Sequence, residues 1–303
     1  MLDGLEGRVG VVTGAGRGLG RAEALELARH GMRLVVNDFG RTLHGDTEDN
    51  PADALVAGIK DNGGEALANY GDVADWNDAA ALVRQAVATY GSLDVLVNNA
   101  GIIRDRTIFN MSEEEWDSVI RTHLKGHFCV SRHATAYWRE KAKASDNEQT
   151  YGRIINTSSE AFLSGPPGQP NYSAAKAGIV QITLSTAQVM AKYGVTANAI
   201  APRAATRMTE AVLPDIEEDG WHLFAPENVS PLVAYLASPE AQRVSGQVFV
   251  VYGKMITVLA APTDDRRFDA EQPWTSKTVA EVLTPFFAKR EPITDGFRVS
   301  LGA

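Results

Sequence analysis

Only one cysteine, Cys129, occurs among the 303 residues of the chain. A single cysteine allows no disulfide within the chain and no cysteine-based zinc cluster, and we expect no metal site. The sequence also lacks an apolar run of about 18 residues, the length of a membrane span. Its first residues have neither the basic nor the apolar segment of a signal peptide. These absences predict a cytoplasmic protein without a membrane partner.

Basic residues are scarce relative to acidic ones. The sequence has 29 Lys and Arg against 38 Asp and Glu, which gives a formal net charge of -9 with neutral His. An acidic chain has no general attraction for nucleic acid or anionic lipid, so neither is an expected partner. A local basic pocket for one phosphorylated small molecule remains compatible with this charge.

Short apolar, β-rich runs alternate with amphipathic stretches along the chain. In the stretch 75–90, apolar residues recur at helical spacing, and Ser112 with Glu115 forms a capping box that begins another helix. Such alternation predicts an α/β protein with a doubly wound Rossmann fold, in which helices cover both faces of a seven-stranded parallel sheet. The predicted strands are 9–13, 34–37, 66–70, 94–98, 153–157, 196–200 and 248–252, and the predicted helices are 18–30, 51–62, 75–90, 113–138, 172–192 and 226–237.

The alternation continues to about residue 253 and then stops. We therefore predict one domain over 1–253 and a C-terminal extension, 254–303, packed on that domain. Within the extension only 278–289 has a helical pattern. Two polar segments, 39–50 and 141–149, are predicted to be loops.

Glycines follow the first predicted strand in the pattern T-G-x-x-x-G-x-G. Glycines at such a turn let backbone N–H groups approach a pyrophosphate at a helix N-terminus. A plain strand-to-helix turn is the alternative for the loop taken alone. The candidate cofactor-binding residues of this loop are Gly14, Gly16, Arg17, Gly18, Leu19 and Gly20.

Asp38 directly follows the second predicted strand, 18 residues past Gly20, where this fold places an acid on the adenosine ribose. A carboxylate there accepts both ribose hydroxyls and repels a 2′-phosphate, so it favours NAD over NADP. Arg17 complicates this preference because it could pair with a 2′-phosphate. The alternative interpretation of Asp38 is an acid that caps a loop.

Further candidate residues follow the third and fourth strands. Asp72 and Val73 could meet the adenine, and the small or amide residues Asn99, Ala100 and Gly101 could brace the sheet and let a cofactor lie close. Each of these segments alone could be only a loop.

Tyr172 and Lys176 share one helix face, because residues four apart are neighbours on a helix. A neighbouring ammonium favours phenolate, so Lys176 could lower the pKa of Tyr172 from its usual value near ~10. Ser159 follows the fifth strand and reaches the same edge of the sheet, where its hydroxyl could bond a carbonyl or alkoxide oxygen. Ser158 is the competitor, but strand neighbours alternate, and its side chain is expected to point elsewhere.

Taken in order, these motifs resemble the short-chain dehydrogenase/reductase family over about residues 5–253. The resemblance implies hydride transfer between a nicotinamide and a carbonyl/alcohol pair. It implies Tyr172 as the acid/base, Ser159 as the residue that orients substrate, and Lys176 as the residue that lowers the tyrosine pKa and binds ribose. The cofactor contacts that it implies are Tyr172, Lys176, Pro202, Ala205 and Thr206.

A closer resemblance lies in segments 36–40, 99–106, 123–126, 200–209 and 274–287. They are similar to the (3R)-hydroxyacyl-CoA dehydrogenase domain of peroxisomal multifunctional enzyme type 2, a subgroup that uses NAD. The chain lacks that enzyme's hydratase and lipid-carrier domains, and it does not end in a peroxisomal S-K-L. We therefore expect a stand-alone cytoplasmic enzyme.

His123 departs from the wider family, whose fourth catalytic residue is an asparagine that holds a relay water with its backbone carbonyl. A backbone role survives the change of side chain, so His123 remains a candidate catalytic residue. Its ring could pack in a helix interface or relay a proton.

The resemblance implies a substrate of the acyl-CoA class. Segment 207–224 is apolar enough for a lid, or for a surface excursion packed on the core. Arg104, Arg106 and Arg207 could meet CoA phosphates or form ordinary ion pairs. The fourth and fifth helices are expected to build a homodimer or homotetramer.

The expected function is NAD-dependent oxidation of (3R)-3-hydroxyacyl-CoA or of a bulkier acyl-CoA. An NAD(P)-dependent enzyme acting on steroids, ketones or acyl-carrier-protein thioesters is the first alternative. A dinucleotide-binding protein without turnover is the second.

Overall fold

A computed structural model of the chain describes residues 2–40, 51–146, 149–206, 216–218, 221–294 and 296–297. Its centre is a sheet of order β10-β9-β6-β5-β4-β1-β2-β3. Neighbouring strands are parallel from β3 to β9, and only β10 is antiparallel to its neighbour. The strands are β1 (Val9–Thr13), β2 (Arg33–Asn37), β3 (Glu65–Asn69), β4 (Val95–Asn98), β5 (Gly152–Thr157), β6 (Val195–Pro202), β9 (Val248–Tyr252) and β10 (Met255–Val258).

The seven predicted parallel strands are therefore confirmed, and β10 is an eighth strand that was not predicted. Gly253 adopts a φ of +53° and turns the chain back, so that Met255 pairs with Tyr252. This hairpin carries the sheet beyond residue 253, where the predicted domain boundary lies. The division into domain and extension remains a prediction.

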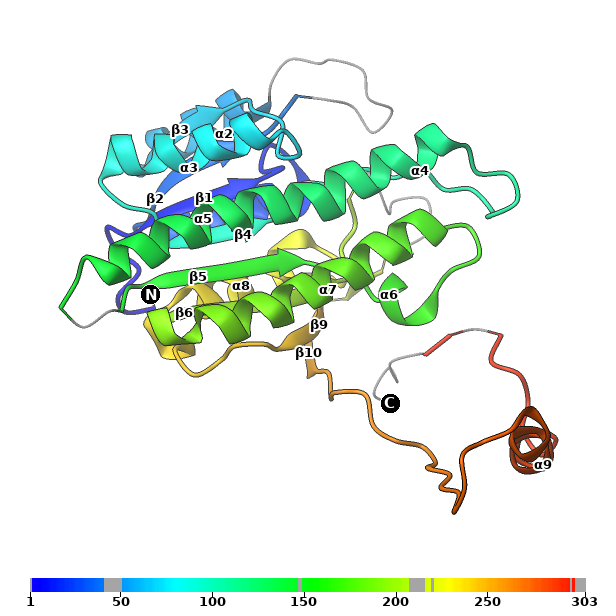
Figure 1. Ribbon diagram of the computed structural model, residues 1–303. Helices are drawn as coiled ribbons and strands as arrows, with labels where there is room; N and C mark the ends of the chain where they lie inside the picture. The colour runs from blue at the N-terminus through cyan, green and yellow to red at the C-terminus, as the bar shows by residue number, and fades with distance from the viewer. Residues whose placement is uncertain are drawn as a thin grey trace.

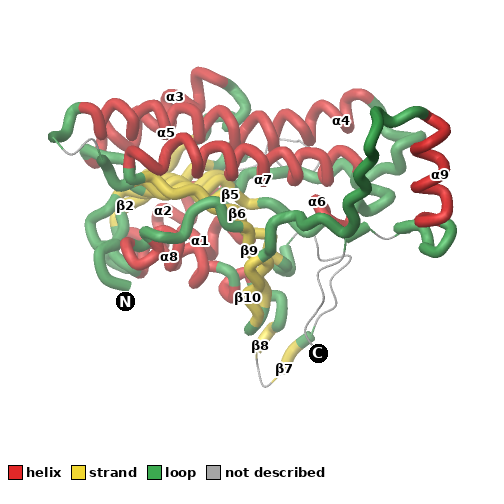
Figure 2. The backbone as a smooth tube through the Cα atoms, turned by 60° about the horizontal axis from the view of Figure 1, so that its bottom comes forward, coloured by secondary structure: helices red, strands yellow, loops and turns green. Residues whose placement is uncertain are grey.

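Helices cover both faces of the sheet, as Figures 1 and 2 show. One core cluster joins the sheet to one set of helices, and a second cluster joins its other face to the remaining set. The first set is α1 (Gly18–Arg29), α2 (Pro51–Asp61) and α8 (Ser230–Ala237), and the second is α3 (Trp76–Tyr90), α5 (Gly126–Lys143) and α7 (Pro170–Met190). α4 (Glu113–Ile120) packs against α7. The doubly wound Rossmann fold is thus confirmed.

The single helix predicted over 113–138 is interrupted. α4 and α5 are joined by a π-helical turn, η1 (Arg121–Lys125), which includes His123. The capping box at the start of α4 is present: the Glu115 N–H donates to Ser112 Oγ at 3.1 Å, and the Ser112 N–H donates to Glu115 Oε2 at 2.9 Å. Local side-chain chemistry therefore fixes where α4 begins, whereas the π turn has no comparable signal in the sequence.

Smaller elements complete the described chain. They are α6 (Ala161–Ser164), η2 (Ala191–Tyr193), β7 (Glu217–Glu218), β8 (Trp221–His222), η3 (Pro226–Asn228), η4 (Pro239–Ala241) and α9 (Ser276–Phe287). α9 has no buried residue and lies apart from the sheet in Figure 1. Farther along, the Phe297 N–H donates to the Leu163 carbonyl at 3.0 Å. None of the helices described is long and apolar enough to cross a membrane.

Candidate active site

The glycine loop between β1 and α1 has room only for glycine at several positions. Gly14 and Gly18 adopt φ angles of +61° and +52°, which other residues rarely take. A Cβ atom on Gly14 would lie 2.7 Å from Ala100 Cα, and one on Gly20 would lie 2.4 Å from the Gly14 carbonyl oxygen. The loop is therefore held close against the end of β4.

Asp38 lies at the end of β2 with its carboxylate turned toward the glycine loop. Its Oδ2 accepts a hydrogen bond from the Gly16 N–H at 3.0 Å, and its Oδ1 accepts one from the Gly40 N–H at 2.9 Å. A Cβ atom on Gly16 would lie 2.8 Å from Oδ2. The acid is thus fixed beside the turn where a dinucleotide's ribose and pyrophosphate would meet.

A cavity of about 520 Å³ opens at this edge of the sheet. It brings together many of the predicted cofactor residues: Gly14, Arg17, Gly18, Leu19, Asp38, Asp72, Val73, Asn99, Ala100, Gly101 and Thr206. Gly16, Gly20, Tyr172, Lys176, Pro202 and Ala205 do not line it. It is also lined by Arg104, which was predicted only as a candidate contact for CoA phosphates, and by residues that sequence reasoning missed: Asn37, Phe39, Gly71, Ile102, Ser118, Arg121 and Thr122.

Among the missed residues, Arg121 has a defined partner. Its Nη1 forms an ion pair with Asp72 Oδ2 at 2.7 Å, while Asp72 Oδ1 accepts from the Ala74 N–H at 2.8 Å. Arg121 comes from η1, far from Asp72 in the sequence, so no local pattern could indicate it. Asn37 precedes Asp38 at the end of β2, so its position in the sequence could have indicated that it lies at the cavity.

Asn99 braces the sheet below the cavity. The N–H groups of Asn99 and Ala100 donate to Thr13 Oγ1 at 3.0 and 3.2 Å, and Asn99 Nδ2 donates to the Gly14 carbonyl at 3.1 Å. These bonds tie the end of β4 to the end of β1 and fix the floor of the cavity.

Tyr172, Ser159 and Lys176 converge beside this edge. The Ser159 side chain lies close enough to the Tyr172 phenol to lower its pKa. Lys176 is buried, its Nζ lies 5.2 Å from the centre of the Tyr172 ring, and it donates to the Thr157 carbonyl at 2.6 Å. Ser158 Oγ instead donates to the Lys176 carbonyl at 3.0 Å, so its side chain does point elsewhere.

Burial dominates the titration of this group. Desolvation, and to a smaller extent the charge of Asp105, raise the pKa of Tyr172 to about 12, against a lowering by the Ser159 side chain. Desolvation lowers the pKa of Lys176 to about 7. The expectation that Lys176 lowers the pKa of Tyr172 is not met here, because the ammonium is directed to the Thr157 carbonyl and burial of the phenol has the larger effect.

His123 is buried with its ring against the loop after β4. Its Nε2 lies 3.1 Å from the Ile102 nitrogen and 2.8 Å from the Ile102 oxygen. Burial, followed by the charge of Lys176, holds the pKa of His123 well below its usual value. The ring is therefore neutral near pH 7, which agrees with the packed interpretation rather than with a charged relay.

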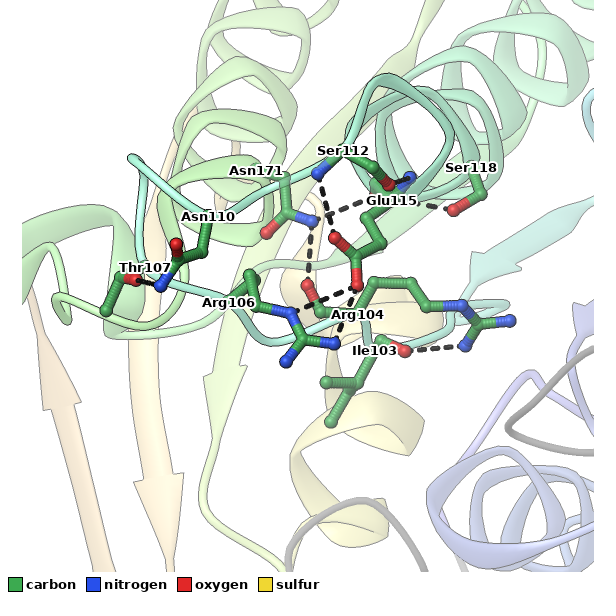
Figure 3. Close-up of polar contacts among 9 residues, drawn as sticks. All are labelled: Ile103, Arg104, Arg106, Thr107, Asn110, Ser112, Glu115, Ser118 and Asn171. Carbon is green, nitrogen blue, oxygen red and sulfur yellow. Dashed lines mark hydrogen bonds and ion pairs between the residues drawn. The ribbon is translucent and has the colours of Figure 1, made fainter.

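The three candidate phosphate-binding arginines lie in different surroundings. Arg106 pairs with Glu115 at 3.1 Å, and Arg104 Nη1 donates to the Ile103 carbonyl at 2.7 Å, as Figure 3 shows. Both line a surface hollow of about 470 Å³ at the start of α4. Arg207 lies outside the described residues. For Arg106, the ordinary ion pair is the interpretation that the structure supports.

Part of the predicted lid also lies outside the described residues, namely 207–215 and 219–220. At its far end Phe224 is buried, stacks on Tyr252 with ring centres 5.7 Å apart, and accepts a hydrogen bond from the Ala205 N–H at 2.6 Å. Thr206 lies against the glycine loop, since a Cβ on Gly18 would be 3.2 Å from its Cγ2. The segment therefore starts beside the cavity.

A glycine cradle, an acid at the end of β2 and a Tyr-Ser-Lys cluster on one Rossmann edge define the class of protein. The chain matches the family model for short chain dehydrogenases over residues 8–217 and belongs to that family. It is an oxidoreductase that acts on CH–OH groups and binds a nicotinamide dinucleotide. The cavity fits such a cofactor, because the glycine loop that opens α1 lines it and a helix N-terminus favours a pyrophosphate.

Within this family, the chain is similar over most of its length to several individual proteins. Hydroxyacyl-CoA dehydrogenase ChsB1 of Mycobacterium tuberculosis is 50% identical over 292 residues, covering 95% of this chain and 91% of that protein. Peroxisomal multifunctional enzyme type 2 of Mus musculus is 44% identical over 242 residues, covering 80% of this chain and 31% of that protein. A crystal structure of a short chain dehydrogenase from Mycobacterium avium superposes with a TM-score of 0.85 at 50% identity, covering 97% of this chain and 99% of that one. The predicted resemblance is confirmed.

Proposed function

We propose that this protein oxidises (3R)-3-hydroxyacyl-CoA thioesters, or a bulkier acyl-CoA, to the 3-oxoacyl-CoA with NAD. The observation that carries the proposal is the convergence of Tyr172, Ser159 and Lys176 beside the cofactor-sized cavity. The acyl-CoA class is supported by the relatives, two of which are a hydroxyacyl-CoA dehydrogenase and a multifunctional peroxisomal enzyme.

The chemistry follows from the positions of the three side chains. A nicotinamide dinucleotide bound in the cavity would supply the hydride acceptor for the alcohol carbon. Tyr172, as its phenolate, takes the alcohol proton. The hydroxyl of Ser159, which adjoins that phenol, turns its single hydrogen to the substrate oxygen. Lys176, buried next to the ring, supplies a donor for ribose hydroxyls. His123 contributes its backbone, with a neutral side chain.

NAD rather than NADP is the proposed cofactor because of Asp38. Two backbone N–H groups hold its carboxylate beside the glycine loop, where it can accept ribose hydroxyls and would repel a 2′-phosphate. Arg17 lines the same cavity and is the side chain that would favour NADP instead. A cytoplasmic location and a homodimer or homotetramer remain predictions.

A panel assay at the nicotinamide absorbance tests the proposal. Purified protein is offered NAD and NADP with 3-hydroxyacyl-CoA esters of both configurations, free steroid alcohols and acyl-carrier-protein thioesters, with Tyr172→Phe as the matched control. The proposal expects turnover of the (3R)-acyl-CoA esters with NAD and at least about 100-fold less turnover in the control. Turnover of free alcohols or carrier-protein thioesters without acyl-CoA activity would refute it, as would cofactor binding with no Tyr172-dependent turnover.

A further inference from the structure

Asn171, the residue before Tyr172, is fully buried in the first turn of α7. Its Nδ2 donates to the Arg104 carbonyl and to the Glu115 carbonyl, each at 3.0 Å, as the dashed lines of Figure 3 show. Its Oδ1 accepts from the Tyr172 N–H at 2.7 Å. One side-chain amide therefore connects the loop after β4, the first turn of α4 and the backbone of Tyr172.

The start of α7 needs such a contact. The first N–H groups of a helix have no partner within the helix, and Gln169 at the N-cap makes no side-chain capping bond. Asn171 provides the acceptor for the N–H of Tyr172 itself. A buried amide with both of its donor hydrogens and its oxygen bonded is held in one orientation, and so is the backbone that it binds.

Other contacts fasten the same two segments together. The Arg106 N–H donates to the Gly168 carbonyl at 2.7 Å, and Gln169 Nε2 donates to Asp105 Oδ2 at 2.9 Å. Glu115, whose carbonyl Asn171 binds, is held through its carboxylate by Arg106. Asn171 thus lies in the buried part of a network that packs 104–106 against 168–171, beside the phenol.

We propose that Asn171 is a positioning residue that fixes the phenol of Tyr172 relative to Ser159 without touching the substrate. The inference rests on the proposed function only in that Tyr172 carries the proton. Proton transfer needs heavy atoms within hydrogen-bond reach, and small displacements from the reactive geometry reduce rates strongly. A first turn of α7 released from α4 would displace the phenol and expose it to water.

The test compares Asn171→Ala with Asn110→Ala, a matched substitution at an exposed asparagine of the neighbouring loop whose Nδ2 bonds only Thr107 among the contacts shown. Oxidation of 3-hydroxyacyl-CoA by NAD is measured from pH 6 to 10. For Asn171→Ala we expect kcat to fall at least about tenfold with KM within about threefold. We also expect the rise of kcat with pH to level off at lower pH than in the wild type, because exposure lowers the pKa of a buried phenol. Asn110→Ala is expected to match the wild type in kcat and pH profile.

Thermal unfolding separates positioning from loss of the fold. If Asn171→Ala shows no cooperative unfolding transition, Asn171→Ser is used in its place, since it keeps an acceptor near the Tyr172 N–H. Its kcat, KM and pH profile are then compared with those of the wild type. A wild-type kcat with a wild-type pH profile would overturn the inference, and so would loss of the unfolding transition in both variants, since Asn171 would then hold the fold instead. A wild-type protein without Tyr172-dependent acyl-CoA turnover would refute the proposed function itself, which distinguishes the two failures.

Discussion

The imidazole of His123 stands edge-on to the phenol of Tyr172, with ring centres 5.1 Å apart and ring planes at 89°. The π-helical turn η1 places His123 here, and Nε2 is occupied by the backbone of Ile102. Edge-to-face aromatic pairs are favourable beyond the area that they bury. His123 therefore forms one wall of the site against which the tyrosine ring rests.

His123→Asn is expected to keep kcat within about tenfold of the wild type, because the ring serves as a packed, neutral wall and not as a proton carrier. The pH profiles of the wild type and the variant should also have the same shape, since burial lowers the pKa of His123 far below the usual histidine value. Steady-state oxidation between pH 5.5 and 8 checks both points. A loss as large as that of Tyr172→Phe would instead assign the imidazole a direct role in proton transfer.

Gly101→Ala is expected to destabilise the protein, because the new Cβ would lie 2.2 Å from Cε1 of the His123 ring. Overpacking of this kind lowers the free energy of unfolding by about 1–3 kcal/mol. Urea denaturation measures the change. The His123→Ala variant lacks the clashing ring. In that background Gly101→Ala should therefore lower the free energy of unfolding by clearly less. An equal loss in both backgrounds would mean that the ring is not the obstacle.

The oxidation rate is expected to rise with pH through the alkaline range. The phenol must be ionised to accept the alcohol proton, and burial raises the pKa of Tyr172 to about 12. The logarithm of kcat/KM for oxidation should therefore climb with a slope of about one from roughly pH 7 to 10. The reverse reaction, reduction of the 3-oxo group, uses the protonated phenol. Its kcat/KM should therefore not rise over the same pH range, and it serves as the internal control. A plateau already below about pH 8 would contradict the prediction and show that the phenol ionises far more easily during turnover.

Much of the fold could be predicted from sequence because its signals are local. β-rich runs mark the parallel strands, the Ser112–Glu115 pair marks the start of α4, and the glycines of the phosphate loop mark the cavity. The hairpin partner β10 was missed even though Gly253 precedes an apolar run, since an antiparallel edge strand breaks the strand–helix alternation.

The site was predictable in its residues but not in its electrostatics. Tyr172 and Lys176 do meet, yet the direction of Lys176 Nζ depends on the Thr157 carbonyl, which lies on another element. The Arg121–Asp72 pair likewise joins residues from distant parts of the chain. Spacing in the sequence places side chains on a face, whereas their partners across elements are set only by tertiary packing.

Asp38→Ala is expected to weaken NAD binding at least about tenfold and to increase the relative affinity for NADP, because the variant loses the carboxylate that we propose faces the ribose. The substitution also leaves the N–H groups of Gly16 and Gly40 without this acceptor. Fluorescence titration with both cofactors measures the dissociation constants. Asp61→Ala, at the exposed end of α2, is the matched control and should bind as the wild type does. An unchanged ratio of NAD to NADP affinity in Asp38→Ala would remove the ribose assignment.

Glu23 offers a prediction about stability that is independent of catalysis. It is fully buried in α1, and neither carboxylate oxygen has a hydrogen-bond partner among the residues that the structure describes. Desolvation raises the pKa of Glu23 from 4.5 to about 8. The folded state thus favours the protonated form of Glu23. The contribution of this acid to the free energy of unfolding is complete at pH values below its pKa in the unfolded chain. It is lost as pH rises toward its pKa in the folded protein.

Glu23→Gln should remove this dependence, since a glutamine has no proton to lose. At pH 7 the variant is expected to be more stable than the wild type by on the order of 3 kcal/mol, and the difference should shrink as pH falls toward 5. Urea denaturation at pH 5, 6, 7 and 8 gives the curve. Glu65→Gln, an exposed acid at the start of β3, is the control and should show no such trend. A Glu23→Gln difference that stays constant with pH would mean that the buried carboxyl ionises at its ordinary pKa in the folded protein.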